Sequence, residues 1–126
     1  MLKFTVITGL NDKETKKQEI TTETAYKIIF KTLKNNGVEG ATLTEAIGFY
    51  THNNGEEVIE KSIKIELLFV DYKTVKAVAE ALRVALNQES IVIESIELNS
   101  ELWEGWKINL LFLYIFFRIL YQAQSK

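Results

Sequence analysis

The chain has 126 residues, of which 47% are hydrophobic, and a formal net charge of −2. This is the size of one domain with enough apolar surface to build a core, which argues against a disordered protein. Cysteine is absent, so disulfides, thiolate catalysis and zinc sites built on sulfur are excluded. The near-neutral charge argues against a nucleic-acid-binding surface.

The first ten residues, MLKFTVITGL, alternate like a strand and lack the long apolar segment and cleavage site of a secretory signal. We therefore expect a cytoplasmic protein, with residues 2–9 as a half-buried strand. The charged, aperiodic segment 10–20 predicts a loop. In it, Lys13, Lys16 and Lys17 are candidates for binding an anion, although a solvated loop is the more ordinary explanation.

The segment 21–37 predicts an amphipathic helix. Apolar residues recur four positions apart from Ala25 to Leu33, behind a candidate cap at Thr21 or Thr22. Gly37 suits the end of such a helix because glycine adopts the left-handed backbone conformation readily.

The segment 42–70 predicts a long β-hairpin, because two alternating runs flank the loop sequence NNG. A three-residue loop pairs Phe49 with Ile59 and Leu43 with Ile65, whereas a two-residue loop mixes apolar and polar partners on each face. We favour the three-residue loop. The apolar face then continues through Ile63, Leu67 and Phe69.

The same register defines a second, polar hairpin face, with Thr42, Thr44, Ala46, Gly48 and Tyr50 opposite Glu60, Ser62, Lys64 and Glu66. Glu60 would lie opposite Gly48, with Tyr50 and Ser62 nearby, so a ligand can approach where no side chain intervenes. This arrangement is a candidate polar pocket, although exposed sheet faces carry such residues routinely. On the apolar face, Glu45 and Lys61 are expected to form a salt bridge.

The segment 71–87 is the clearest amphipathic helix, with Asp71 as its cap, and residues 90–98 alternate like a last strand. The resulting order β-α-β-β-α-β predicts a ferredoxin-like α+β fold, with two helices on one face of an antiparallel sheet in the strand order 4-1-3-2. The other sheet face is left for solvent, a ligand or another subunit.

The remaining polar candidates have ordinary explanations as well. Gln88, Glu89 and Ser90 join the last helix to the last strand, where turn chemistry explains them, but they are also candidates for ligand binding. His52 flanks the hairpin loop and is expected to be an exposed polar residue rather than a base or ligand. The sequence contains no phosphate-binding loop, and we expect no catalytic residue set, metal site or cofactor.

Residues 102–126 form an apolar tail, expected to be helical, that follows the domain of residues 1–101. The run from Ile108 to Tyr121 would span about 21 Å as a helix, against roughly 30 Å of bilayer hydrocarbon. Three explanations stay open: burial against the domain or a second copy, attachment to a membrane surface, and an extension never selected for folding.

Several of these motifs resemble those of a family of small, functionally uncharacterised bacterial proteins. The family pattern has a glycine before a strand, a turn glycine, an E-x-S strand and a Q-E-S segment followed by aliphatic residues. The matching pieces are GATL at 40–43, Gly55, EKS at 60–62 and QESI at 88–91. The resemblance covers residues 2–98, but the family's aromatic-rich first strand and Trp-bearing helix have no counterpart. It supports the fold and the candidate residues Glu60, Ser62, Gln88, Glu89 and Ser90, and implies no catalysis.

Three functions follow from these observations. The first is a non-enzymatic homo-oligomer that binds a small polar, nucleotide-like ligand, such as a phage or mobile-element protein that sequesters a signalling molecule. The second is a protein-interaction or membrane-peripheral module that docks through its tail. The third is a small enzyme with Glu60 or Glu89 as general base, near Tyr50 or His52.

Overall fold

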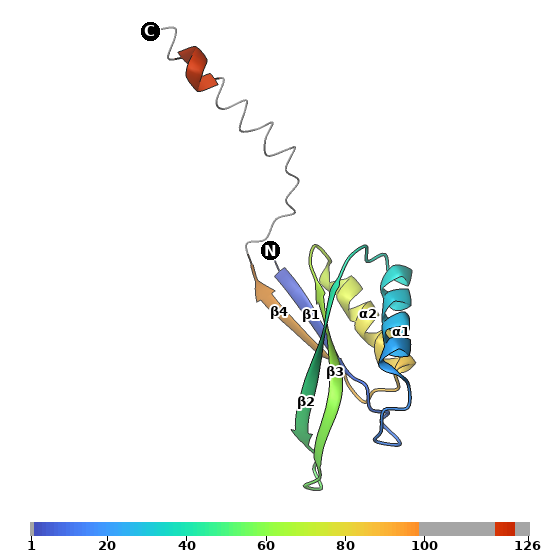
Figure 1. Ribbon diagram of the computed structural model, residues 1–126. Helices are drawn as coiled ribbons and strands as arrows, with labels where there is room; N and C mark the ends of the chain where they lie inside the picture. Colours follow the sequence, from blue (N-terminus) through green and yellow to red (C-terminus); the bar gives the residue numbers. More distant parts are fainter. Residues whose placement is uncertain (1, 99–117, 123–126) are drawn as a thin grey trace.

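The computed structural model describes residues 2–98 and 118–122. The first of these segments folds as an antiparallel sheet with the strand order β2-β3-β1-β4, and two helices cover one of its faces (Figure 1). The elements are β1 (Leu2–Gly9), α1 (Thr22–Asn35), β2 (Thr42–Thr51), β3 (Glu57–Leu67), α2 (Tyr72–Ala85) and β4 (Val92–Glu97). The predicted ferredoxin-like α+β fold and its strand order are therefore confirmed.

Both helices begin at side chains that cap them. The hydroxyl of Thr21 accepts a hydrogen bond from the backbone N–H of Thr24 at 3.1 Å, and Asp71 accepts one from the N–H of Thr74 at 2.7 Å. Each bond satisfies a backbone donor that has no partner within the helix. The first helix ends before Gly37, which has a φ of +74°.

The core lies between the two helices and the sheet face that they cover. The largest fully buried side chains all belong to these layers: Val6, Thr8, Ile29, Ile63, Ile65, Leu67, Val75, Val78 and Leu82. Burial of each aliphatic side chain contributes roughly 1.5–3 kcal/mol to folding. The alternation in β1 and β3 and the helical spacing in α1 and α2 thus bring their apolar positions into one layer.

Strands β2 and β3 pair in the register predicted for a three-residue loop. Phe49 lies opposite Ile59 and Leu43 opposite Ile65, and Gly55 closes the turn with a φ of +85°. The loop end of this hairpin projects beyond both helices (Figure 1).

The projecting part of the hairpin has no helix over its helix-facing side. As a result Ile47, Phe49 and Ile59 are 79%, 64% and 70% exposed, although the same pattern buries their counterparts farther along the hairpin. These three residues, called the hairpin patch below, form an apolar surface that no other described element covers.

Two predictions for the hairpin are wrong. Phe69 does not continue the face of β3, because the strand ends at Leu67 and Phe69 is exposed in a turn with a φ of +60°. The chain must leave the sheet there to reach the cap of α2.

The expected salt bridge between Glu45 and Lys61 is also not observed. Instead the Tyr26 hydroxyl donates to Glu45 at 2.6 Å, and the Lys61 ammonium donates to the Thr22 hydroxyl at 3.2 Å. Each side chain therefore finds a polar partner on or beside α1, which lies over this edge of the sheet.

Neither of the two helices covers the other face of the sheet, called the open face below (Figure 1). On this face the hairpin carries the small and charged residues predicted from its register, among them Ala46, Gly48, Glu60, Ser62 and Lys64. β1 and β4 add apolar residues that the hairpin pattern did not reveal, since Ile7 pairs with Val92 and Lys3 with Ile96. Val92 and Ile96 are about half exposed.

The tail run Ile108 to Tyr121 lies mostly outside the described residues, of which only 118–122 fall beyond residue 98. Within the described ranges, no helix combines the length and the apolar character needed to span a bilayer. The three explanations of the tail stay predictions.

Candidate functional site

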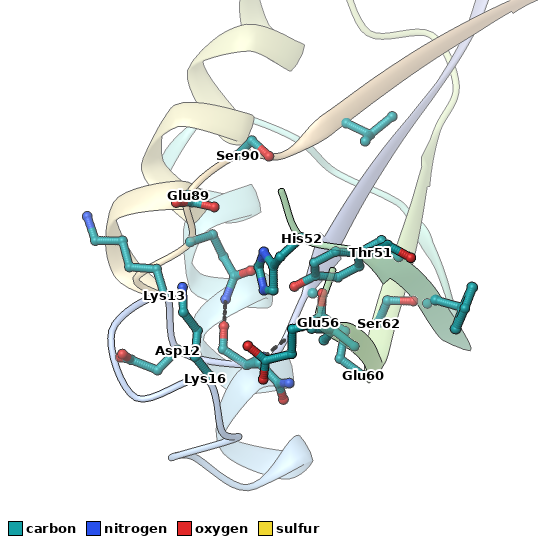
Figure 2. Close-up of a pocket in the computed structure, with 18 of the residues that line it drawn as sticks. Asp12, Lys13, Lys16, Thr51, His52, Glu56, Glu60, Ser62, Glu89 and Ser90 are labelled. Carbon is teal, nitrogen blue, oxygen red and sulfur yellow. Dashed lines mark hydrogen bonds between the residues drawn. The ribbon is translucent and has the colours of Figure 1, made fainter. Parts of the chain in front are cut away.

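A hollow of about 780 Å³ lies where the hairpin, the loop after β1 and the segment between α2 and β4 come together (Figure 2). Small-molecule pockets are typically about 300–1,000 Å³. The fold gathers here nearly all the residues that the sequence suggested for ligand or anion binding. Lys13, Lys16, Tyr50, Glu60, Ser62, Gln88, Glu89 and Ser90 line the hollow, whereas Lys17 does not.

Glu60 is held in the pocket by two backbone features. It lies opposite Gly48 in the hairpin, and its carboxylate occupies the space where a β-carbon on Gly9 would stand. Its Oε2 accepts a hydrogen bond from the backbone N–H of Asn11 at 3.1 Å. Glycine at position 9 therefore leaves the room that the carboxylate fills, and the turn after β1 supplies a donor.

Tyr50 lies beside this carboxylate, on the same face of the hairpin. Burial, the adjacent Glu60 carboxylate and the more distant Glu89 all raise the pKa of the Tyr50 hydroxyl above its ordinary value. The phenol is therefore a neutral hydrogen-bonding group at physiological pH. Its side chain is 41% exposed, so part of the ring faces the hollow.

His52 differs from the expected exposed residue. It is half-buried, its ring meets that of Tyr50 edge-on at 5.2 Å between centroids, and its Nε2 is buried. That nitrogen has no hydrogen-bond partner among the residues that the structure describes. The sequence pattern missed this placement because it depends on how the hairpin end meets the α2–β4 segment.

The loop after β1 is fixed against the end of α2. The Asn87 side-chain amide donates to the Asp12 carboxylate at 2.7 Å, and the backbone N–H of Lys13 donates to the Asn87 carbonyl at 3.0 Å. The Asn87 bond, followed by the backbone N–H groups of Thr15 and Glu14, holds the pKa of Asp12 below its ordinary value. The loop is thus a defined wall of the pocket.

Gln88 has a structural role in this arrangement. It is buried, and its side-chain amide donates to the backbone carbonyls of Asn11 at 2.8 Å and Leu86 at 3.0 Å. Its prediction as a ligand-binding residue is untested, but its NH₂ group is already engaged. Ser62 is buried below Glu60, while Glu89 and Ser90 are exposed at the rim.

The pocket therefore combines carboxylates, a neutral phenol and an unpartnered imidazole nitrogen with two lysines at the wall. Neither Glu60 nor Glu89 forms an ion pair with any residue in the described part of the chain, where Lys3–Glu66 and Arg83–Glu80 are paired. Over the same ranges, no cluster of three His, Asp or Glu side chains is arranged to hold a metal ion. This set suits recognition of a polar, charged organic molecule.

A second hollow of about 660 Å³ lies at the opposite end of the sheet, between residues 37–42 and the segment after β3. Its charged lining residues are Glu39 and Glu66, and the latter is already paired with Lys3. None of the candidate residues faces it, so the site is assigned to the first hollow.

No protein-family model matches the sequence, and no curated protein matches it either. Solved structures do resemble the fold. A phage SAM lyase without ligand superposes with a TM-score of 0.63 at 24% identity, and one in complex with S-methyl-5'-thioadenosine with 0.62 at 23%. Each match covers 82% of this chain and 92% of the other.

The fold is also similar to that of the periplasmic divalent cation tolerance protein CutA from Archaeoglobus fulgidus. Here the TM-score is 0.55 at 16% identity, over 82% of this chain and 90% of the other. At these identities the similarities establish a shared ferredoxin-like α+β fold. These similarities define the fold of the protein, and its function depends on the residues of the pocket.

Proposed function

We propose that the protein is a homo-oligomer that binds a positively charged nucleoside derivative, with S-adenosylmethionine (SAM) as the ligand, in the pocket beside the loop end of the hairpin. The observation that carries this proposal is the position of Tyr50 beside the Glu60 carboxylate, in a pocket where neither Glu60 nor Glu89 forms an ion pair with a described residue. The proposal rests on three supports: charge, shape and fold.

The charge of the site favours a cationic ligand. A carboxylate held in a partly enclosed pocket gains stability when a positive group comes within about 4–6 Å. Among the described residues, Glu60 has neutral partners, the backbone N–H of Asn11 at 3.1 Å and the Tyr50 hydroxyl, and forms no ion pair; Glu89 also lines the pocket. A sulfonium or ammonium group would supply the missing charge.

The shape of the site favours a planar group next to that charge. The exposed part of the Tyr50 ring offers an apolar surface on which a base can stack, and the neutral phenol can donate to a ribose hydroxyl or a ring nitrogen. The volume of about 780 Å³ accommodates a nucleoside with a short side chain. The phage SAM lyase that shares this fold holds an adenosine thioether, which supports this class of ligand.

The proposal of a homo-oligomer is supported by two uncovered apolar surfaces. One is the hairpin patch, and the other is the open-face pair Val92 and Ile96. Exposed apolar clusters of this kind commonly mark protein contacts. The hairpin patch is on the helix-facing side of the sheet and the pair is on the open face, so each offers a separate contact to a second copy.

Calorimetric titration of the purified protein with SAM and with S-methyl-5'-thioadenosine tests the binding proposal. We expect SAM to bind, and Glu60→Gln to weaken SAM binding at least tenfold, because the substitution removes a charge-assisted contact. Glu57→Gln is the matched control, since Glu57 is on the same strand but does not line the pocket. Failure of SAM to bind, or equal effects of the two variants, would contradict the proposal.

A second candidate function is cleavage of SAM, and the juxtaposition of Tyr50 with Glu60 favours it. In this step the carboxylate of SAM attacks its own γ-carbon while the bond from that carbon to sulfur breaks. The electron pair stays on sulfur, and the products are a lactone and the neutral thioether. A carboxylate at the sulfonium and a neutral phenol at the substrate would position the molecule for this step. A binder that does not cleave would instead sequester SAM.

Chromatographic detection of S-methyl-5'-thioadenosine, against a sample of SAM without protein, separates the two functions. Release above the spontaneous rate, lost in Tyr50→Phe and Glu60→Gln, would establish a lyase. Binding without release would establish sequestration.

A further inference from the structure

Two lysines form part of the pocket wall, opposite in charge to the acidic residues around them. Lys13 and Lys16 line the hollow, while Lys17 in the same loop does not. In Figure 2, Lys13 and Lys16 lie on one side of His52, and Ser62 and Thr51 lie on the other. The pocket thus has a cationic wall in addition to its carboxylates.

The loop presents these lysines in a fixed arrangement. The backbone of Asp12 bonds to both ends of the turn, accepting from the N–H of Lys16 at 2.9 Å and donating to the carbonyl of Lys17 at 2.8 Å. Lys16 has a φ of +64°, a left-handed conformation unusual for lysine. The side chains of Asn87 and Gln88 then bind this turn to the end of α2. The positions of the two backbones are therefore set by contacts on both sides.

Among the described residues, no salt bridge joins the two lysines to the pocket carboxylates. Over residues 2–98, neither Lys13 nor Lys16 forms an ion pair, whereas Lys3 and Arg83 lie at 3.2 and 2.7 Å from their acidic partners. Asp12 and Glu89 lie on the same side of the pocket as the two lysines (Figure 2), whereas Glu60 is on β3. A ligand with both a positive and a negative group would contact the Glu60 carboxylate and the two lysines at the same time.

We propose that Lys13 and Lys16 bind an anionic group of the ligand, so that the pocket selects a zwitterion whose positive centre lies near Glu60. For SAM, the carboxylate of the amino-acid part would lie against the two lysines and the sulfonium would face Glu60 and Tyr50. This assignment rests on the proposed function and adds the orientation of the ligand and the residues that determine its specificity.

The test compares three ligands with three proteins by calorimetric titration. The ligands are SAM, decarboxylated SAM, which lacks only the carboxylate, and S-methyl-5'-thioadenosine, which lacks the whole amino-acid part. The proteins are the unaltered chain, the double variant Lys13→Met with Lys16→Met, and the control Lys17→Met. Methionine keeps the length of the side chain and removes its charge, and thermal unfolding checks that each variant folds.

In the unaltered protein, we expect SAM to bind at least tenfold more tightly than its decarboxylated form, since a charge-assisted contact is worth this much. In the double variant, the two should bind within about twofold of each other because the partner of the carboxylate is gone. Binding of S-methyl-5'-thioadenosine should be unchanged in every protein, and Lys17→Met should behave like the unaltered chain.

Three results would overturn the assignment, and they separate it from the proposed function. Equal binding of SAM and its decarboxylated form by the unaltered protein, or equal weakening of all ligands by the double variant, would refute the role of the lysines alone. If none of the three compounds binds the unaltered protein, the proposed function fails and this assignment fails with it.

Discussion

At the scale of single residues, Gly9 leaves the space that the Glu60 carboxylate occupies. An alanine there would place its β-carbon on the Glu60 carboxylate, the flexible end of a long side chain. The carboxylate can swing away, so the fold should tolerate the change while the site loses its arrangement.

We therefore expect Gly9→Ala to change the free energy of unfolding by less than about 1 kcal/mol but to weaken SAM binding about as much as Glu60→Gln does. Thermal unfolding and calorimetric titration measure the two effects. Gly40→Ala is the matched control, because a β-carbon at position 40 meets no atom within 4 Å. A severe loss of stability with unchanged binding would show that Gly9 is needed for packing only.

The pKa of Tyr50 tests the pairing with Glu60 directly. Burial and the two carboxylates raise it above the ordinary value of 10.0. The folded protein then holds the phenol proton more tightly than the unfolded chain does. This contribution to stability is fully present below about pH 10 and is lost as the pH rises through the folded-state pKa.

Glu60→Gln should lower the pKa of Tyr50 but leave it above 10.0, because burial is the largest cause. Titration of ¹³C-labelled tyrosine by NMR measures the shift. Tyr26 is an internal control, since its raised pKa comes from Glu45 and should not move. An unchanged Tyr50 titration would mean that the carboxylate does not act on the phenol.

At the scale of elements, the β2–β3 hairpin joins the core and the site. Its helix-facing side is buried where α1 and α2 cover it and exposed where the hairpin projects, although the sequence alternates throughout. Alternation sets the face of a residue but does not tell whether another element covers that face. The alternation therefore does not distinguish the exposed hairpin patch from the buried part of the same face.

We expect the double substitution Ile47→Thr with Ile59→Thr to reduce the mass of the protein in solution, measured by light scattering, toward that of the monomer. Threonine keeps the β-branch that suits a strand, and exposed positions contribute little to monomer stability, so unfolding should shift by no more than about 0.5 kcal/mol for each site. Val84→Thr, which changes an exposed valine on α2, should leave the mass unchanged. An oligomer unaffected by the hairpin substitutions would have its interface elsewhere.

The loop after β1 illustrates what patterns along the chain cannot reveal. Its charged, aperiodic composition predicted a loop correctly, and the three lysines were equivalent in sequence. In the folded chain the loop is bonded to Asn87 and Gln88, and Lys13 and Lys16 line the pocket whereas Lys17 does not.

At the scale of the whole molecule, the described hydrophobic core lies within residues 4–93 and is built from the two helices and one face of the sheet. The domain boundary at residue 101 was predicted and is untested. A chain of residues 1–101 retains every side chain of this core.

We therefore expect protein lacking residues 102–126 to unfold cooperatively, with a midpoint close to that of the full chain, as followed by circular dichroism. Light scattering on both proteins distinguishes the explanations of the tail. A smaller mass after truncation indicates a tail that joins subunits, and an unchanged mass indicates a tail that does not. Loss of cooperative unfolding would contradict the prediction and make the tail part of the core.

By itself the sequence determined the element order, the strand order, the cap at Asp71, and the hairpin register that places Tyr50, Glu60 and Ser62 on one face; it left the first cap open between Thr21 and Thr22, and the structure shows Thr21. These features depend on neighbouring residues and on periodicity, both of which can be read from short stretches of the sequence. The tertiary structure alone decided the wall of the pocket, because its bonds join residues far apart: Asn11 to Glu60 across 49 positions, and Asp12 to Asn87 across 75. Such contacts form only once the sheet has brought the ends of separate elements together, so local sequence patterns do not predict them.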